Sequence, residues 1–272
     1  MNQIKLIFSD MDGTLLNNEG KLSQQTIDSV RRLRHKKIAF ILTSARSPEG
    51  MADAARQLDL QTMPFISYNG GLIGRFQPDG HLDTLESTPL EPSDRRAIYS
   101  YVNARCPDVN LSAFVENTWY VRQIDARVAR EAELSGCQPV MTDLGHLIGT
   151  CRLPFYKFML MAPAETTDQL MHAFSAHAYP HTAVTRSHPT YLEVTHRQAT
   201  KLHAVKKLAD YLGVTQEAIA AFGDQYNDLD MLNYASVGIA VKNAPQTIQD
   251  AANILTESNE NDGVALALNR YF

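Results

Sequence analysis

The chain has 272 residues, 44% of them hydrophobic and 20% charged, a balance typical of one large or two moderate globular domains. Its net charge of −5, with no basic stripe, argues against nucleic acid as a partner. The longest apolar runs, such as Phe158 to Ala162, are too short to cross a bilayer, so we expect no membrane partner.

The first part of the chain alternates between apolar strands and amphipathic helices. Strands are expected at residues 5–9 and from Ile38 onward, and each is followed by a helix, the first capped by Ser23 and the second opened by Ser47 and Pro48. The stretch PFISYNGGLI at residues 64–73 predicts strand, turn and strand. This alternation predicts an α/β fold whose core contains a parallel sheet.

The pattern changes after about Pro78. AFVENTWYVRQI at residues 113–124 predicts antiparallel strands, YKFMLMA at 156–162 another strand, and ETTDQLMHAF at 165–174 a helix. We therefore expect an inserted α+β domain of ordinary size. The predicted boundaries are 1–82 for the first part of the core, 83–187 for the insertion and 188–272 for the second part of the core.

Strands and helices alternate again in the last third of the chain. Thr200 is expected to cap a helix that Gly213 closes. The segments that follow are predicted as strand, helix, strand, helix, strand and helix, at residues 218–224, 227–235, 236–241, 245–252, 253–256 and 263–272. The two ends of the chain are therefore predicted to form one core.

Polar side chains follow the predicted core strands. They are Asp10 and Asp12 after the first strand, Ser44 and Arg46 after the second, Asn69 after the third, and Asp224 after the strand at 218–224, with Lys201 opening a helix. Ligands of open α/β sheets bind beyond the carboxyl ends of the strands. Carboxylates gathered there suit Mg²⁺, and a lysine and a serine hydroxyl beside them suit a phosphoryl group.

Each of these residues also has a plainer interpretation. An Asp-Gly pair after a strand is typical of a turn, and a lysine in the first turn of a helix is typically solvated. Asp224, Asn227 and Asp228 are equally suited to capping the next helix. Their joint occurrence, in order, at strand ends favours the catalytic interpretation.

Four motifs resemble those of the haloacid-dehalogenase-like (HAD) phosphatases. DMDGTLL at residues 10–16 resembles their first motif, LTSAR at 42–46 the second, Lys201 the third and GDQYNDLDML at 223–232 the fourth. SYNGGLI, VKNA and SNENDGVA are similar to stretches of the Cof-type branch. The resemblance implies a Rossmann-like parallel-sheet core with an inserted α+β cap domain of type C2.

The resemblance also implies a role for each matched residue. Asp10 would attack phosphorus and form an aspartyl-phosphate, while Asp12 would protonate the leaving group and then activate water. The other implied roles are Mg²⁺ binding by Asp10, the Asp12 carbonyl, Asp224 and Asp228; phosphate binding by the Met11 and Ala45 backbone, Ser44, Lys201 and Asn227; and flanking of the substrate mouth by Arg46, Asn69 and Asn243.

Two motifs depart from the family pattern. The second usually contains Thr-Gly-Arg, whereas this chain has Ser44-Ala45-Arg46. Because the freedom of glycine to adopt positive φ is lost, we expect this loop to lie slightly differently. The third usually has glycines on both sides of its lysine, and here both are absent around Lys201. We expect the lysine to keep its role.

These observations predict a Mg²⁺-dependent phosphatase of small phosphorylated metabolites, such as sugar phosphates or phosphorylated cofactors. The alternatives are a sugar phosphomutase or phosphotransferase with the same aspartyl-phosphate, and a non-catalytic metabolite-binding regulator. We expect a monomer or weak homo-oligomer.

An N-terminus unlike a signal peptide, and three widely spaced cysteines, predict a cytoplasmic protein. No zinc is expected at His172, His177 and His181, because their spacing runs from a helix into a loop.

Overall fold

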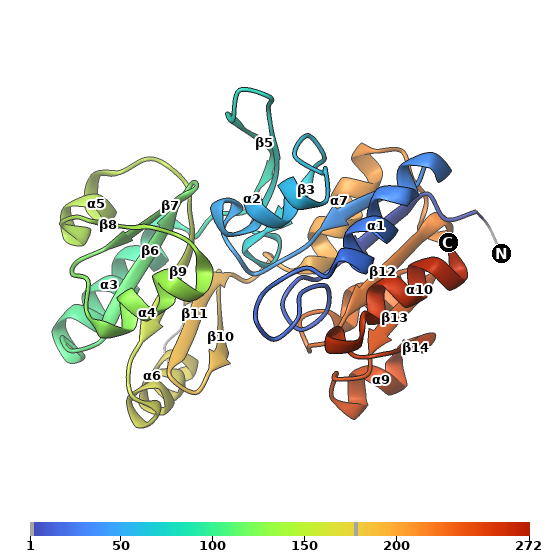
Figure 1. Cartoon of the computed structure of the whole chain (residues 1–272). Helices are drawn as coiled ribbons and strands as arrows, with labels where there is room; N and C mark the ends of the chain where they lie inside the picture. Colours follow the sequence, from blue (N-terminus) through green and yellow to red (C-terminus); the bar gives the residue numbers. More distant parts are fainter. Residues whose placement is uncertain (1–2, 177–178) are drawn as a thin grey trace. The chain divides into compact units, whose positions relative to one another are not determined.

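The computed structural model describes residues 3–176 and 179–272. The chain divides into two compact units. Met1–Glu86 and Thr200–Phe272 form the first, here called the core unit, and Ser87–Ala199 form the second, here called the cap unit. Figure 1 shows both units and labels many of their elements. Within the described residues, no helix combines the length and the apolar character needed to span a membrane.

A parallel sheet of five strands lies at the centre of the core unit, in the order β14-β13-β12-β1-β2. Its strands are β1 (Leu6–Ser9), β2 (Ala39–Leu42), β12 (Ile219–Gly223), β13 (Val237–Val241) and β14 (Ile254–Thr256). A smaller antiparallel sheet holds β3 (Phe65–Ser67), β4 (Leu72–Phe76) and β5 (Leu82–Ser87). The strands of the parallel sheet are short and apolar, which suits a sheet that is buried on both faces.

Helices cover both faces of the parallel sheet (Figure 1). They are α1 (Gln24–Arg32), α2 (Pro48–Gln57), α7 (Lys201–Tyr211), α8 (Leu229–Tyr234), α9 (Gln246–Ala251) and α10 (Gly263–Tyr271), with 3₁₀ turns at Leu33–Lys36, Tyr68–Gly70, Gln216–Ala218 and Asn259–Asn261. Ile7 packs in a cluster with α1, α2 and α10, whereas Phe8 packs with α7, α8 and α9. Alternate residues of β1 thus face opposite layers, which confirms the predicted α/β core.

Three of the predicted helix starts are set by local capping. The side chain of Ser23 accepts a hydrogen bond from the Thr26 amide, and that of Ser47 accepts one from the Gly50 amide. Thr200 accepts from the His203 amide at 3.1 Å. Caps of this kind satisfy amides that have no partner inside the helix. The cap at Thr200 fixes the start of α7.

A sheet of six strands forms the centre of the cap unit, in the order β10-β11-β9-β6-β7-β8. Its strands are β6 (Asn110–Val115), β7 (Thr118–Val121), β8 (Pro139–Met141), β9 (Phe155–Met161), β10 (Thr182–His188) and β11 (Tyr191–His196). The cap helices are α3 (Pro92–Arg105), α4 (Ala126–Ser135), α5 (Leu144–Thr150) and α6 (Ala164–Ala176). One apolar cluster joins α3, α5 and α6 to the sheet.

The second unit ends later than the predicted insertion, at Ala199 instead of residue 187. The reason is that β11 pairs with β9, and β10 pairs with β11, so both strands belong to the cap sheet. Of the three histidines considered above, His177 lies outside the described residues, and the ring of His181 stacks on that of His196.

Candidate active site

Three neighbouring strands of the core sheet end in polar residues. β1 lies between β12 and β2. Asp10 follows β1, Asp224 follows β12 and Ser44 lies just beyond β2. The amide of Asp10 donates to the carbonyl of Phe222 at 3.0 Å, which continues the pairing past the end of β1. The carboxyl ends of the parallel strands therefore bring these side chains to one edge of the sheet.

The loop after β1 turns sharply at its glycine. The carbonyl of Met11 accepts hydrogen bonds from the amides of residues 14–16, and the Met11 side chain is buried in the core. Gly13 has a φ of 81°, and a Cβ there would lie 2.6 Å from a carboxylate oxygen of Asp224. Glycine is thus required both by the turn and by the carboxylate packed against it.

Asp10, Asp224 and Asp228 form a buried carboxylate cluster. One carboxylate oxygen of each lies within 4.8 Å of the others, and the residues are 6%, 2% and 0% exposed. Asp228 accepts hydrogen bonds from the amides of Asp224 (3.1 Å) and Gln225 (3.0 Å). Thr14 donates its hydroxyl proton to Asp224 at 2.6 Å. The carboxylates are therefore held in place by donors from two loops.

Burial and mutual repulsion disfavour the charged form of this cluster. Burial raises the pKa of Asp10 well above its usual value; Lys201 opposes this rise, and the charges of Asp228 and Asp224 add to it. Burial also raises the pKa of Asp224, against the hydrogen bond from Thr14. Three carboxylates facing a single ammonium make a site that attracts a further cation.

Lys201 is the cation inside the cluster. It is 1% exposed, and its Nζ donates to Asp10 at 2.5 Å and to Asp228 at 2.6 Å. Burial alone would lower the pKa of Lys201, but the two carboxylates outweigh burial and raise it. The lysine therefore remains charged and fixes the orientation of Asp10.

Asp12 lies apart from the cluster and is held by Arg46. The guanidinium donates to both carboxylate oxygens of Asp12, at 2.8 and 2.6 Å, and also to the carbonyl of Gly50 at 3.1 Å. The Asp12 side chain is 55% exposed. A forked pair of this kind fixes the direction of a carboxylate, so Arg46 orients Asp12 in addition to lying at the edge of the site.

The loops after β2 and β3 lie against each other. Ser44 is 1% exposed, and its hydroxyl accepts from the Arg46 amide at 3.1 Å. Ala45 is not among the residues with positive φ, so the loop needs no glycine at that position. Asn69 has a φ of 57°, its amide donates to the Ser44 carbonyl, and its side chain accepts from the Asn227 side chain at 3.0 Å. Asn69 and Asn227 thus join two strand ends.

Asn243 connects loops at the same edge of the sheet. Its side-chain amide donates to the carbonyl of Gly13 at 2.7 Å, and its side-chain oxygen accepts from the amide of Asn259 at 3.0 Å. Both ends of the Asn243 side chain therefore hold backbone in place. The sequence had suggested a place at the substrate mouth, and it gave no sign of these contacts.

Two further residues support the site without having been predicted. Thr14 holds Asp224, as described above. Gly70 has a φ of 100°, and a Cβ there would lie 2.3 Å from the carbonyl oxygen of Thr200. This close approach sets the position of the residue that precedes Lys201. The Asn69-Gly70 pair, a dipeptide that favours positive φ, is the sequence signal that could have indicated it.

The family of the chain follows from comparison with known proteins. A family model described as haloacid dehalogenase-like hydrolase matches residues 7–268. The chain belongs to this family. The resemblance seen in the four motifs is therefore confirmed, and the chain is an enzyme of the haloacid dehalogenase-like hydrolases.

The relatives match this hydrolase over nearly its whole length. A Haemophilus influenzae protein named "Putative phosphatase" is 33% identical over 274 residues, covering 98% of each chain. A Bacillus subtilis protein named 5-amino-6-(5-phospho-D-ribitylamino)uracil phosphatase YitU is 27% identical, with 98% of this chain and 97% of the relative covered. A haloacid dehalogenase-like hydrolase from Bacteroides thetaiotaomicron matches with a TM-score of 0.89 and 26% identity, over 99% of this chain and 100% of the other.

Proposed function

We propose that this hydrolase is a Mg²⁺-dependent phosphatase that acts on small phosphorylated metabolites through an aspartyl-phosphate on Asp10. The observation that carries the proposal is the division between two carboxylates of one loop. Asp10 is buried and bonded to Lys201, whereas Asp12 is half exposed and bonded to Arg46. A nucleophile and a proton carrier need different surroundings of this kind.

The chemistry of the carboxylate cluster fits Mg²⁺. All donors are hard oxygen ligands, and their charge exceeds that of Lys201. Asp10, Asp224 and Asp228 would hold the ion, together with the Asp12 carbonyl that the resemblance implies. When bound, the ion would offset charge on the phosphoryl oxygens.

The residues of the chain supply the chemical steps. An oxygen of Asp10 attacks phosphorus, the bond to the leaving oxygen breaks, and Asp12 gives that oxygen its proton. Asp12 then takes a proton from water as the water oxygen attacks phosphorus, and the bond to Asp10 breaks to release inorganic phosphate. Ser44, Lys201, Asn227 and the amides of Met11 and Ala45 would bind the phosphoryl oxygens.

The substrates we propose are sugar phosphates or phosphorylated cofactors and their precursors. The name of the Bacillus subtilis relative, a phosphatase of a phosphorylated ribitylaminouracil, supports this class. We further propose a cytoplasmic monomer or weak homo-oligomer. Among the described residues, Cys106, Cys137 and Cys151 form no disulfide, which fits a reducing compartment.

The test is phosphate release from a panel of phosphorylated metabolites, with and without Mg²⁺. We expect turnover that requires Mg²⁺ and falls at least ~10³-fold in Asp10→Asn, because the nucleophile is lost. Asp53→Asn, an exposed carboxylate of α2, is the matched control and should keep full activity. Full activity in Asp10→Asn would contradict the proposal. Exchange between hexose phosphate isomers without free phosphate, followed by NMR, would identify a mutase instead.

A further inference from the structure

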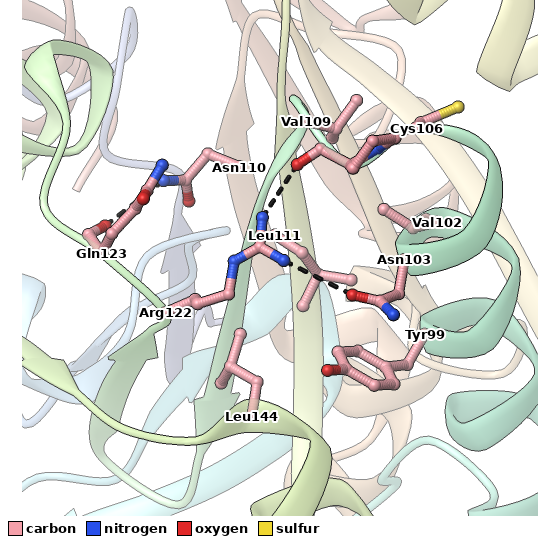
Figure 2. A pocket seen from close by; sticks show the side chains of 11 residues that line it. Tyr99, Val102, Asn103, Cys106, Val109, Asn110, Leu111, Arg122, Gln123 and Leu144 are labelled. Carbon is pink, nitrogen blue, oxygen red and sulfur yellow. Dashed lines mark hydrogen bonds between the residues drawn. The ribbon is translucent and has the colours of Figure 1, made fainter.

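Two hollows of the cap unit that border arginines differ in how these arginines are paired. The smaller, of about 20 Å³, lies between α3 and the strands β6 and β7 (Figure 2). Arg122 donates to the side chain of Asn103 at 3.4 Å (Figure 2) and to the carbonyl of Pro107 at 2.8 Å. This hollow has room for about one water molecule, and its arginine already has partners.

The larger hollow is a groove of about 740 Å³ formed by the cap unit alone. Its walls are the start of α3 and the segment 149–155, which runs from the end of α5 into β9. Arg95, Arg96 and Arg152 line it, against a single carboxylate, Glu91. Among the residues that the structure describes, none of these three arginines takes part in an ion pair. The groove therefore has an excess of positive charge.

Arg95 is the buried member of this set. It is 6% exposed, its guanidinium lies 4.3 Å from the centre of the Phe155 ring, and it donates to the Cys151 carbonyl at 2.7 Å. Its Nε is buried and has no hydrogen-bond partner. A buried charge without a counter-charge is costly, and one carbonyl and one ring compensate it only in part. The arrangement is stable at lower cost when an anion occupies the groove.

We propose that this groove, here called the cap groove, binds a small organic anion that carries a phosphate or carboxylate group. Arg95 supplies a fixed positive charge, held flat by Phe155, and the exposed Arg96 and Arg152 supply planar donors that suit either anion. Leu90 and Leu153 add an apolar wall, so a ligand with an apolar part beside its anionic group binds best. This site is made of cap residues and is additional to the proposed phosphatase site.

The test follows the guanidinium of Arg95 by NMR in the full chain, labelled with ¹⁵N-arginine. The probes are inorganic phosphate and phenylphosphonate, which cannot be hydrolysed, and Arg95→Lys assigns the signal. We expect a saturable shift of the Arg95 Nε–H signal, reached at a lower concentration of phenylphosphonate than of phosphate. No shift with either probe would overturn the proposal. The readout needs no turnover, so it is independent of whether the phosphatase proposal holds.

Variants of the exposed arginines keep the test informative if Arg95→Lys does not fold. Arg96→Gln with Arg152→Gln should raise the Kd for phenylphosphonate at least ~10-fold, because two charged donors are lost. The matched control is Arg105→Gln, an exposed arginine at the opposite end of α3, which should leave the Kd unchanged. An equal loss in the control, or no loss in the double variant, would overturn the proposal.

A final arm separates the cap groove from the phosphate contacts of the core. The titration is repeated in Ser44→Ala with Asn227→Ala, which removes two proposed phosphate donors of the core unit. We expect the Arg95 signal to shift with an unchanged Kd. Loss of the shift in this variant would assign the anion to the phosphatase site and would overturn a separate site in the cap.

Discussion

The core and cap units bury charge in different proportions. In the core, three carboxylates face one ammonium at the end of the sheet. In the cap, Lys157 forms an ion pair with Glu193 at 3.2 Å across the adjacent strands β9 and β11, and the ammonium also lies 4.8 Å from the centre of the Phe114 ring. A balanced pair needs no further partner, whereas an unbalanced cluster has an affinity for ions from solution.

This difference separates a structural use of charge from a functional one. The Lys157–Glu193 pair lies within a sheet and completes its packing. The core cluster, and in the opposite sense Arg95, leave a charge that a bound ion of the opposite sign would offset. Variants that change the balance in each unit should therefore have different consequences.

The largest effect is expected when the ammonium of the core cluster is removed. Lys201→Met leaves Asp10 and Asp228 facing each other without their shared donor. We expect phosphate release to fall by at least ~10³-fold and the free energy of unfolding to fall by ~3–5 kcal/mol at neutral pH. Steady-state kinetics and urea unfolding measure the two effects.

The control for this variant is Lys207→Ala on the same helix. Lys207 is half exposed and lies 3.8 Å from Glu86, a distance typical of a weak surface pair. It should change stability by no more than ~0.5 kcal/mol. Equal effects of the two variants would show that the cluster has no special dependence on Lys201.

In the balanced pair of the cap, removal of one charge should be costly, whereas removal of both charges should cost little. Lys157→Met leaves Glu193 buried without its partner and should lower the free energy of unfolding by ~3–5 kcal/mol. Lys157→Met with Glu193→Leu removes both charges and should regain most of that loss. Urea unfolding of the wild type, both single variants and the double variant forms a double-mutant cycle. A double variant as unstable as the sum of the singles would mean that the pair contributes nothing as a pair.

Most of the core fold could be predicted because its signals are local. Ser23, Ser47 and Thr200 stand where helices begin, and short apolar runs between them form the strands. The end of the cap unit could not be predicted in the same way. The stretch that forms β10 and β11 is strand-like in either unit, and only its long-range pairing with β9 decides where it belongs.

The candidate site likewise has a part that could be predicted from the sequence and a part that could not. Asp10, Lys201 and Asp224 were predicted to lie together from their places at strand ends and at a helix start, and the family resemblance added Asp228; the structure brings all four together. The bond from Arg46 to Asp12 and the bridging role of Asn243 depend on loop conformations that no short pattern specifies. Likewise, the loss of glycine at Ala45 was expected to alter the loop, but the backbone there does not need positive φ.

A smaller effect is expected when the paired hydrogen bonds from Arg46 to Asp12 are weakened but the positive charge at residue 46 is kept. Arg46→Lys keeps a cation beside Asp12 but cannot donate to both carboxylate oxygens in one plane. We expect kcat to fall ~10-fold, about 1.4 kcal/mol of transition-state stabilisation, with little change in KM. Arg56→Lys, an exposed arginine of α2, is the control. A change confined to KM would mean that Arg46 binds substrate and does not position Asp12.

The smallest effect concerns His196, a buried histidine of the cap that is neutral near pH 7. Burial lowers the pKa of His196 from its usual 6.5; Glu91 and Asp94 oppose this, whereas His181 and Arg197 add to it. The ring nitrogen Nδ1 accepts from the Gln198 amide at 3.1 Å, a bond that protonation of Nδ1 would break.

Because the pKa of His196 is lower in the folded chain, the unfolded chain binds more protons, and stability should fall as the pH drops below about 6.5. His196→Gln should reduce the difference in unfolding free energy between pH 7.5 and pH 5.5, whereas the exposed His146→Gln should leave it unchanged. Urea unfolding at both pH values measures it. An unaltered difference in His196→Gln would show that protonation of His196 does not contribute to the pH dependence of stability.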